Sequence, residues 1–401
     1  MIYKLLFVFP RIDIANGMNR FGFHTINFFR QIVFPLCAPC RKMPTMPFFP
    51  RFYSVLPKSN RFDYLLMKNN RRKARKNNLS EEVNRMKSKP VHPIRDIYPW
   101  KNKQQFVDHL AENVIYNKDG LIAINKPYGV PLLKDGLIKG PNEMMFSIEE
   151  ALTPLASLLN VEKLLPAKMV EKFASGVSLF ASQEKMVDKI RQSYITNKAK
   201  KIHTFKYLAV TIGEPKPSSS RGTVGMGFFE HQGIEGKLLA IMKDYSNRKV
   251  ADGLVREFRV NYKTLSRGDE PCSLVEIDVS SAKKHFLRVY LAHLFSPILG
   301  DHIFGNRVQE IMGKRLAISP LQADNLSIFQ KIPAGILTRL KVTESCIVPN
   351  CLHLSQMTLA KFASQDSDLV LKADPPPCFQ YICQTFGLDL PTDESVVLTR
   401  E

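Results

Sequence analysis

Short apolar runs bounded by turn residues make up most of the pattern between residues 114 and 280. Residues 114–127 predict two strands joined at Asp119–Gly120, because Asp-Gly between two apolar runs is a strong hairpin signal. Further strands are predicted over residues 175–181, 203–213, 255–266 and 272–280. Strands that follow one another closely along a chain are usually neighbours in the same sheet.

Three segments carry apolar residues at helical spacing instead. Residues 147–160 predict a helix that begins with a capping box, since Ser147 is followed three residues later by Glu150. Helices are also predicted over residues 182–197 and 283–295. Because so few helices separate the strands, the pattern favours an α+β domain with a mostly antiparallel sheet over a doubly wound parallel sheet.

The basic residues are concentrated at the N-terminus. The 401 residues carry a net charge of +20, and residues 1–80 hold 15 Lys/Arg against two acids, Asp13 and Asp63. A segment rich in Arg and nearly free of acids is typical of mitochondrial import signals. Residues 1–60 are therefore predicted to be a mitochondrial transit segment, which places the protein in the mitochondrial matrix. A disordered basic arm is the alternative.

The rest of the chain divides into three parts. Residues 61–99, centred on "RRKARKNN", are predicted to form a basic polar arm or linker, which would also attract phosphate backbones. The folded domain is expected over residues 100–365. The periodic pattern weakens beyond it, so residues 366–401 are predicted to be a C-terminal tail. No apolar run approaches the 18 residues of a membrane span.

Several classes of site lack their sequence pattern. The seven cysteines are odd in number and mostly scattered, which argues against a disulfide framework and fits a reducing compartment. "CAPC" at residues 37–40 lies in the predicted transit segment without a second pair at zinc spacing. The nine histidines include no HExxH, so no metal site is predicted. There is also no glycine-rich phosphate loop of the nucleotide-binding types.

Three residues are candidates for chemistry. Glu171 lies between Lys168 and Lys172, just before a Ser-Gly turn and an apolar strand, where a loop can present an acid to a cleft. Tyr207 lies within an apolar strand. Arg288 lies in an apolar helix, where a charge is costly unless it is paired. Each residue alone also fits an ordinary role, as a solvated loop acid, a core tyrosine or a snorkelling arginine.

Four segments in this order resemble the RluA-type RNA pseudouridine synthase family, in particular its animal mitochondrial members. They are "GLIAINKPYGVPLL" (120–133), "FKYLAVTIG" (205–213), "KKHFLRVYLAHLFSPILGDHIFG" (283–305) and "CLHLSQMTL" (351–359). The resemblance implies a mixed α/β fold with a long, mostly antiparallel sheet and a cleft across its middle. It also implies isomerisation of uridine to pseudouridine in RNA, with no cofactor and no metal.

The resemblance assigns the site residue by residue. Glu171 falls at the position of the essential aspartate. Tyr207 falls at the tyrosine that packs on the uracil, and Arg288 at the basic residue that pairs with the carboxylate. The implied RNA contacts fall on Lys126, Lys168, Met169, Lys206, Lys283 and Lys284. The expected partner is RNA, whether ribosomal, transfer or messenger, together with mitochondrial ribosome or RNA-granule proteins. The protein is expected to be a monomer.

The sequence departs from the family pattern where the chemistry lies. The motif His-Arg-Leu-Asp is represented by Lys168, Met169, Val170 and Glu171. Glutamate adds one methylene, and a shift of about 1 Å can cost about 100-fold in rate. Two hypotheses follow: Glu171 serves as the catalytic carboxylate in a repositioned cleft, or the domain is an inactive RNA-binding or mitoribosome-assembly factor. A module that binds only proteins is a third class, and it would show no salt-dependent binding of RNA.

Overall fold

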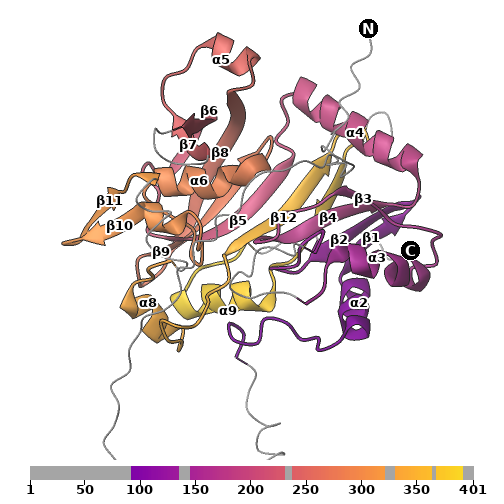
Figure 1. Cartoon of the computed structure of the whole chain (residues 1–401), viewed down its shortest axis with the longest axis horizontal. Coiled ribbons are helices and arrows are strands. Elements are labelled where there is room, and N and C mark those ends of the chain that lie inside the picture. The colour runs from indigo at the N-terminus through magenta and orange to yellow at the C-terminus, as the bar shows by residue number, and fades with distance from the viewer. Residues whose placement is uncertain (1–91, 135–144, 231–236, 321–329, 364–366, 392–401) are drawn as a thin grey trace, which may run out of the picture. The chain divides into compact units, whose positions relative to one another are not determined.

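One mixed sheet forms the centre of the described part of the chain (Figure 1). The computed structural model describes residues 92–134, 145–230, 237–320, 330–363 and 367–391. The predicted transit segment, the basic arm through residue 91 and the cysteine pair at residues 37–40 lie outside the described residues. The sheet contains the strands β1 (Val114–Lys118), β2 (Leu121–Lys126), β3 (Leu165–Lys168), β4 (Ser175–Ala181), β5 (Phe205–Ile212), β6 (Ser219–Glu230), β7 (Lys237–Met242), β8 (Val255–Arg267), β9 (Cys272–Val279), β12 (Leu352–Leu359) and β13 (Leu369–Lys372).

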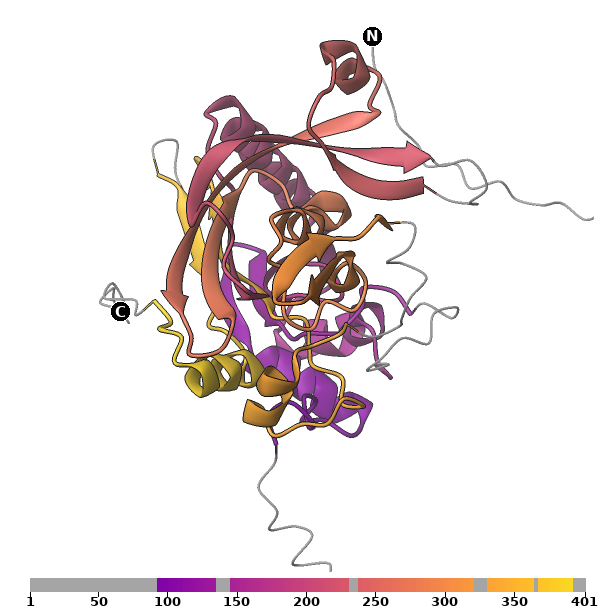
Figure 2. The ribbon, with the colours of Figure 1, turned by 90° about the vertical axis from the view of Figure 1, so that its left-hand side faces the viewer.

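The strand order is β1-β2-β4-β12-β5-β9-β8-β6-β7, with β3 paired to β4 and β13 paired to β12. The pairing of β4 with β12 is parallel, and the other pairings in this sheet are antiparallel. The expected α+β fold with a mostly antiparallel mixed sheet is therefore confirmed. Figure 2 shows the strong twist of the sheet, with the long strands β6 and β8 turned away from the direction of the central strands.

The helices are α2 (Lys103–Glu112), α3 (Ile148–Leu158), α4 (Glu184–Ala199), α5 (Asn247–Ala251), α6 (Phe286–His293), α8 (Ala334–Arg339) and α9 (Pro377–Phe386). Two short 3₁₀ turns, η1 (Lys283–His285) and η2 (Gly305–Arg307), flank α6 and the turn after it, and β10 (Val308–Ile311) pairs with β11 (Lys314–Ala317) in a separate hairpin. No helix in the described residues is both long and apolar enough to cross a membrane.

Side-chain alternation along the central strands produces the two hydrophobic cores. On β2, Leu121 and Ala123 belong to the large core, whereas Ile122 and Ile124 belong to a smaller one. Successive residues of a strand face opposite sides of the sheet, so these two cores lie on its two faces. The smaller core is closed by α2 and α3, whose buried residues include Phe106 and Leu155.

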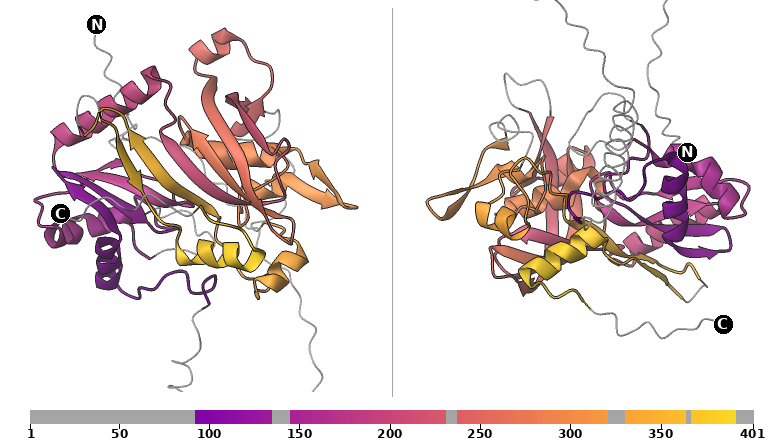
Figure 3. Two further views of the ribbon diagram at one scale, coloured as in Figure 1. Left: turned by 180° about the vertical axis from the view of Figure 1, so that it is seen from behind. Right: turned by 90° about the horizontal axis from the view of Figure 1, so that it is seen from below.

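The structure differs from the sequence prediction at two elements. The helix expected over 283–295 begins only at Phe286, because Lys284 and His285 have left-handed φ values of 56° and 57°. The folded part also extends beyond residue 365, since β13 pairs with β12 and α9 packs into the large core. Seen from behind, α9 lies at the lower end of β12 (Figure 3).

Candidate functional site

The loop between β3 and β4 carries Glu171, and three neighbours hold this loop in place. It makes the hydrogen bonds Val170 N–H to Ser178 Oγ (3.3 Å), Asn350 Nδ2 to the Phe173 carbonyl (2.8 Å) and Gly129 N–H to the Lys172 carbonyl (2.8 Å). These partners come from β4, from the segment before β12 and from the loop after β2. The backbone on both sides of Glu171 is therefore tied to separate parts of the fold.

Gly176 allows this loop to approach the middle of the sheet. Its φ is +117°, and a Cβ at this position would lie 2.2 Å from the backbone oxygen of Leu354. Only glycine adopts such a φ readily and leaves room for the neighbouring backbone. Leu354 of β12 is paired with Gly176 on one side and with Tyr207 of β5 on the other. The start of β4 at Ser175 and Gly176 thus brings the Glu171 loop within one strand of Tyr207.

A cavity of about 190 Å³ lies at this point. Its walls are residues 168–171, residues 282–285, two side chains of β5 and two of β12, namely Lys168, Met169, Val170, Glu171, Phe205, Tyr207, Ala282, Lys283, Lys284, His285, Leu354 and Met357. The structure therefore brings together six of the residues predicted from the sequence. A larger open depression of about 940 Å³ lies between β6, β7, α5 and α6, and none of the predicted residues lines it.

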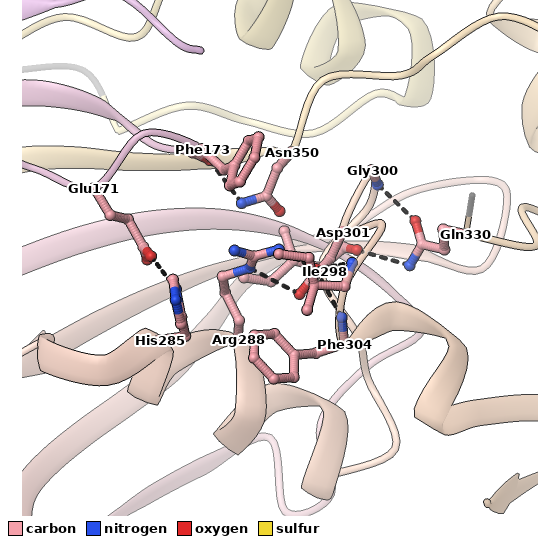
Figure 4. A network of polar contacts seen from close by, with 11 residues as sticks. Glu171, Phe173, His285, Arg288, Ile298, Gly300, Asp301, Phe304, Gln330 and Asn350 are labelled. Carbon is pink, nitrogen blue, oxygen red and sulfur yellow. Dashed lines mark hydrogen bonds and ion pairs between the residues drawn. The ribbon is translucent and has the colours of Figure 1, made fainter. Parts of the chain in front are cut away.

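The resemblance implied that Glu171 pairs with Arg288, but each of the two residues has a different partner in the structure. The carboxylate of Glu171 is bonded to Nδ1 of His285, and these two side chains are 23% and 40% exposed (Figure 4). Arg288 is fully buried and binds Asp301, through Nε to Oδ2 at 3.1 Å and through Nη2 to Oδ1. The predicted pairing is wrong because the turn after α6 supplies a closer carboxylate.

The Arg288–Asp301 pair is satisfied on the acid side and incomplete on the arginine side. Oδ1 of Asp301 also accepts the backbone N–H groups of Ile303 and Phe304, each at 3.0 Å. Nη1 of Arg288 has no hydrogen-bond partner among the described residues. A buried pair of this kind is held by its charge-assisted hydrogen bonds, which offset the loss of solvation.

The electrostatics of this pair keep both groups charged. Burial by itself would lower the pKa of Arg288, but Asp301 and, less strongly, Glu171 raise it above its ordinary value. Burial by itself would raise the pKa of Asp301, but Arg288 and the two backbone N–H groups hold it below its ordinary value. Arg288 is therefore a fixed cation behind the cavity.

Tyr207 and Lys168 line the cavity in environments that favour their neutral forms. The pKa of Tyr207 is raised above its ordinary value, first by burial and then by the charges of Glu171 and Tyr194. Its hydroxyl is protonated at neutral pH. The pKa of Lys168 is lowered by burial and then by Lys283, and its ammonium lies 5.2 Å from the ring centroid of Phe205.

Two of the predicted RNA-binding lysines do not belong to the site. Lys126 is 1% exposed, and its ammonium donates to the carbonyls of Pro127 (2.9 Å) and Val130 (3.1 Å). Burial lowers the pKa of Lys126 to about 7, although Glu171 acts in the opposite direction. Lys206 forms ion pairs with Glu276 (3.3 Å) and Asp278 (3.7 Å) of β9. Neither lysine lines the cavity, and the groups that each one binds in the structure belong to the protein itself.

His285 is the residue of the site that sequence reasoning missed. It stands in "KKHFLRVYL", next to two lysines that were predicted to bind RNA. Its backbone is left-handed, a conformation that is uncommon for residues other than glycine and that is enriched at functional sites. Its ring packs against Phe304, with 5.6 Å between the centroids. Among the described residues, no group of three or more His, Cys, Asp or Glu side chains could hold a metal ion.

Comparisons with known proteins find related sequences and a related fold. The family described as RNA pseudouridylate synthase matches residues 120–293, a range that contains Glu171, Tyr207 and Arg288. The human mitochondrial mRNA pseudouridine synthase RPUSD3 is 27% identical over 293 residues, which cover 72% of this chain and 80% of that protein. The rat mitochondrial pseudouridylate synthase RPUSD4 is 27% identical over 300 residues, which cover 71% of this chain and 72% of that protein. Among solved structures, human RNA Pseudouridylate Synthase Domain Containing 4 is similar to this chain, with a TM-score of 0.52 and 22% sequence identity. The similar region covers 72% of this chain and 98% of that one, so the two share the fold.

Proposed function

Because the chain belongs to the RNA pseudouridylate synthase family, we propose that it converts specific uridines of mitochondrial RNA into pseudouridine. The human and rat relatives RPUSD3 and RPUSD4 are named as mitochondrial proteins, and residues 1–60 have the composition of an import signal. The protein is therefore mitochondrial. The observation that carries the proposal is the convergence of Glu171 and Tyr207, from separate elements, on one cavity. Contact with mitochondrial ribosome or RNA-granule proteins stays a prediction, which co-purification from mitochondria would test.

The size and the surroundings of the cavity suit one nucleobase. Its volume of about 190 Å³ is below the range of about 300–1,000 Å³ that holds drug-sized ligands. A uridine within RNA reaches such a site only when it leaves the base stack, at a cost of a few kcal/mol. Lys283 and Lys284 are exposed at the cavity and can contact the phosphates on either side of that uridine. Met169 offers an apolar contact beside them.

Glu171 supplies the carboxylate that the reaction requires. The C1′–N1 bond of uridine breaks, the uracil turns, and a new bond joins C1′ to C5. The proton on C5 is removed and N1 gains one, so the atoms balance in an isomerisation. The carboxylate acts either as a nucleophile at the sugar or as a base at a neighbouring carbon. Arg288 lies behind the cavity, near enough for its charge and that of Glu171 to interact.

Tyr207 packs beside the uracil and is protonated when the reaction starts. Part of the rise in its pKa comes from the negative charge of Glu171. If Glu171 forms an ester with C1′, this charge is lost and the pKa of Tyr207 falls. Tyr207 can accept the proton that leaves C5 only after it has given up its own hydroxyl proton, which can go to N1, the atom that gains a proton in the isomerisation.

Mapping of pseudouridine in mitochondrial RNA tests the proposal. Mitochondrial RNA from cells that lack the protein would be incubated with the wild-type chain, with Glu171→Gln and with Lys206→Gln as a matched surface control. We expect the wild type and the control to form the same pseudouridine sites, and Glu171→Gln to lose at least about 100-fold in rate. RNA binding without pseudouridine in any arm would instead support an inactive RNA-binding factor.

A further inference from the structure

We propose that His285 is the positioning residue that holds the Glu171 carboxylate in the cavity, in place of Arg288. The inference rests on the proposed function and concerns how this chain uses a glutamate at its essential position. The contact itself joins two distant parts of the chain, the β3–β4 loop and the turn before α6. In Figure 4 the side chain of Glu171 extends towards His285, and Arg288 points towards Asp301.

Arg288 makes no hydrogen bond to Glu171 in the structure. Its Nε and Nη2 groups are bound to the Asp301 carboxylate, and the guanidinium lies against the rings of Phe173 (5.4 Å) and Phe304 (5.1 Å). Its remaining group, Nη1, has no hydrogen-bond partner among the described residues. The partner that the Glu171 carboxylate does have is Nδ1 of His285.

The local backbone directs His285 to Glu171. Lys284 and His285 both have left-handed φ, so the chain turns sharply just before α6 begins. This turn places the imidazole against Phe304 on one side and the Glu171 carboxylate on the other. Such a conformation persists only where the surrounding structure enforces it. The extra methylene of glutamate gives the carboxylate the reach to meet the imidazole.

The contact between Glu171 and His285 lies in a cavity whose other charged side chains are basic. Lys168, Lys283 and Lys284 line the same cavity, as does the hydroxyl-bearing Tyr207. Arg288 and Asp301 lie behind it and balance each other. Among the described lining residues, Glu171 is the acid and His285 the imidazole. An N–H donor at His285 satisfies the carboxylate, and the exposed side chains of Lys283 and Lys284 can meet phosphate.

Kinetics of paired variants test the role of the imidazole. His285→Gly keeps the left-handed backbone and removes the ring, whereas His285→Asn keeps an N–H donor near the position of Nδ1 and tolerates the same backbone. We expect His285→Gly to lower kcat about 10- to 100-fold with KM for RNA changed less than about 3-fold, and His285→Asn to recover most of the loss. In a Glu171→Asp background, whose shorter carboxylate withdraws from the imidazole, removing His285 should cost less than about 3-fold.

A second measurement does not depend on turnover. The imidazole nitrogen resonances of His285, identified by their loss in His285→Asn, should shift in Glu171→Gln and not in Lys206→Gln. A lack of shift in Glu171→Gln, or a kcat for His285→Gly within about 3-fold of the wild type, overturns the inference. If the shift is seen and no variant or wild type modifies any RNA, the proposed function fails while the Glu171–His285 contact stands.

Discussion

His353 is fully buried in β12, and both of its ring nitrogens have partners. Nδ1 lies 2.9 Å from Oγ of Ser175, and Nε2 lies 2.9 Å from the carbonyl oxygen of Ala373. Nε2 therefore donates to the carbonyl, and Nδ1 accepts from the serine hydroxyl. Burial lowers the pKa of His353 from 6.5 to about 4, so the ring is neutral in the folded protein.

This neutral histidine predicts a loss of stability in mild acid. Below pH 6.5 the unfolded chain takes up a proton at residue 353 that the folded chain refuses, so the free energy of unfolding falls as the pH falls. The contribution is flat above about pH 7, is lost between about pH 6.5 and 4, and amounts to about 3 kcal/mol. Denaturant unfolding at a series of pH values should show this slope in the wild type and a shallower slope in His353→Gln. Equal slopes in the two proteins would contradict the prediction.

At the level of single residues, the sequence identified which side chains needed a partner but not which partner they have. An arginine within an apolar helix indicates a buried pair, and Arg288 does form one. Its partner, Asp301, competes with Glu171 for the same guanidinium, and only the fold decides between them. The sequence could have predicted that Lys206 does not line the cavity. Neighbouring residues of a strand face opposite sides of the sheet, and Tyr207 faces the cavity.

Among the elements, the contact between β4 and β12 depends on a single glycine. Gly176 has a φ of +117°, and a methyl group there would lie 2.2 Å from the Leu354 oxygen. The affected atoms are backbone in the middle of the sheet, so neither strand can move aside without breaking its other pairings.

We therefore expect Gly176→Ala to lower the free energy of unfolding by about 2–4 kcal/mol, through strain and overpacking. Gly222→Ala on β6 is the matched control, since a Cβ there meets nothing within 4 Å and the position is exposed. This control should change stability by less than about 0.5 kcal/mol. Comparable denaturant midpoints for the two variants would show that the close approach is not rigid.

Elements with strong local signals were predicted correctly from the sequence. The hairpin at Asp119–Gly120 and the capping box of α3 both form as expected. The start of α6 was missed, because the polar residues 283–285 fit the first turn of a helix as well as they fit the left-handed turn. The turn is fixed by the contacts of His285 with Phe304 and Glu171, which come from distant parts of the chain. Local periodicity carries no information about such contacts.

At the scale of the whole molecule, the sequence located the cleft and placed the end of the domain too early. The four motif segments lie on β2, β5, α6 and β12, and the cavity lies across the middle of the sheet as expected. The segment "DPPPC" (374–378) lies within the predicted tail. In the structure the prolines lead directly into α9, whose first residue is Pro377, a position where the missing N–H of proline costs nothing.

The extended domain predicts a sharp difference between two truncations. A chain that ends at residue 365 loses β13, α9 and the residues just after α9, which bury Leu371, Phe379, Ile382, Cys383, Phe386 and Leu388. At about 1.5–3 kcal/mol for each fully buried apolar side chain, the loss is about 10 kcal/mol or more, comparable with the whole stability of a typical domain. The truncation also removes Ala373, which accepts a hydrogen bond from the buried ring of His353.

We therefore expect the chain ending at residue 365 to lack a cooperative unfolding transition, and a chain ending at residue 391 to unfold as the full-length protein does. Circular dichroism with increasing denaturant would measure both. Point variants separate the effect of α9 from that of chain length: Phe386→Ala removes a fully buried ring and should cost about 3–5 kcal/mol, whereas Gln384→Ala on the exposed face of the same helix should cost less than about 0.5 kcal/mol. A native-like transition in the shorter chain would mean that the sheet through β12 holds the site without the C-terminal elements.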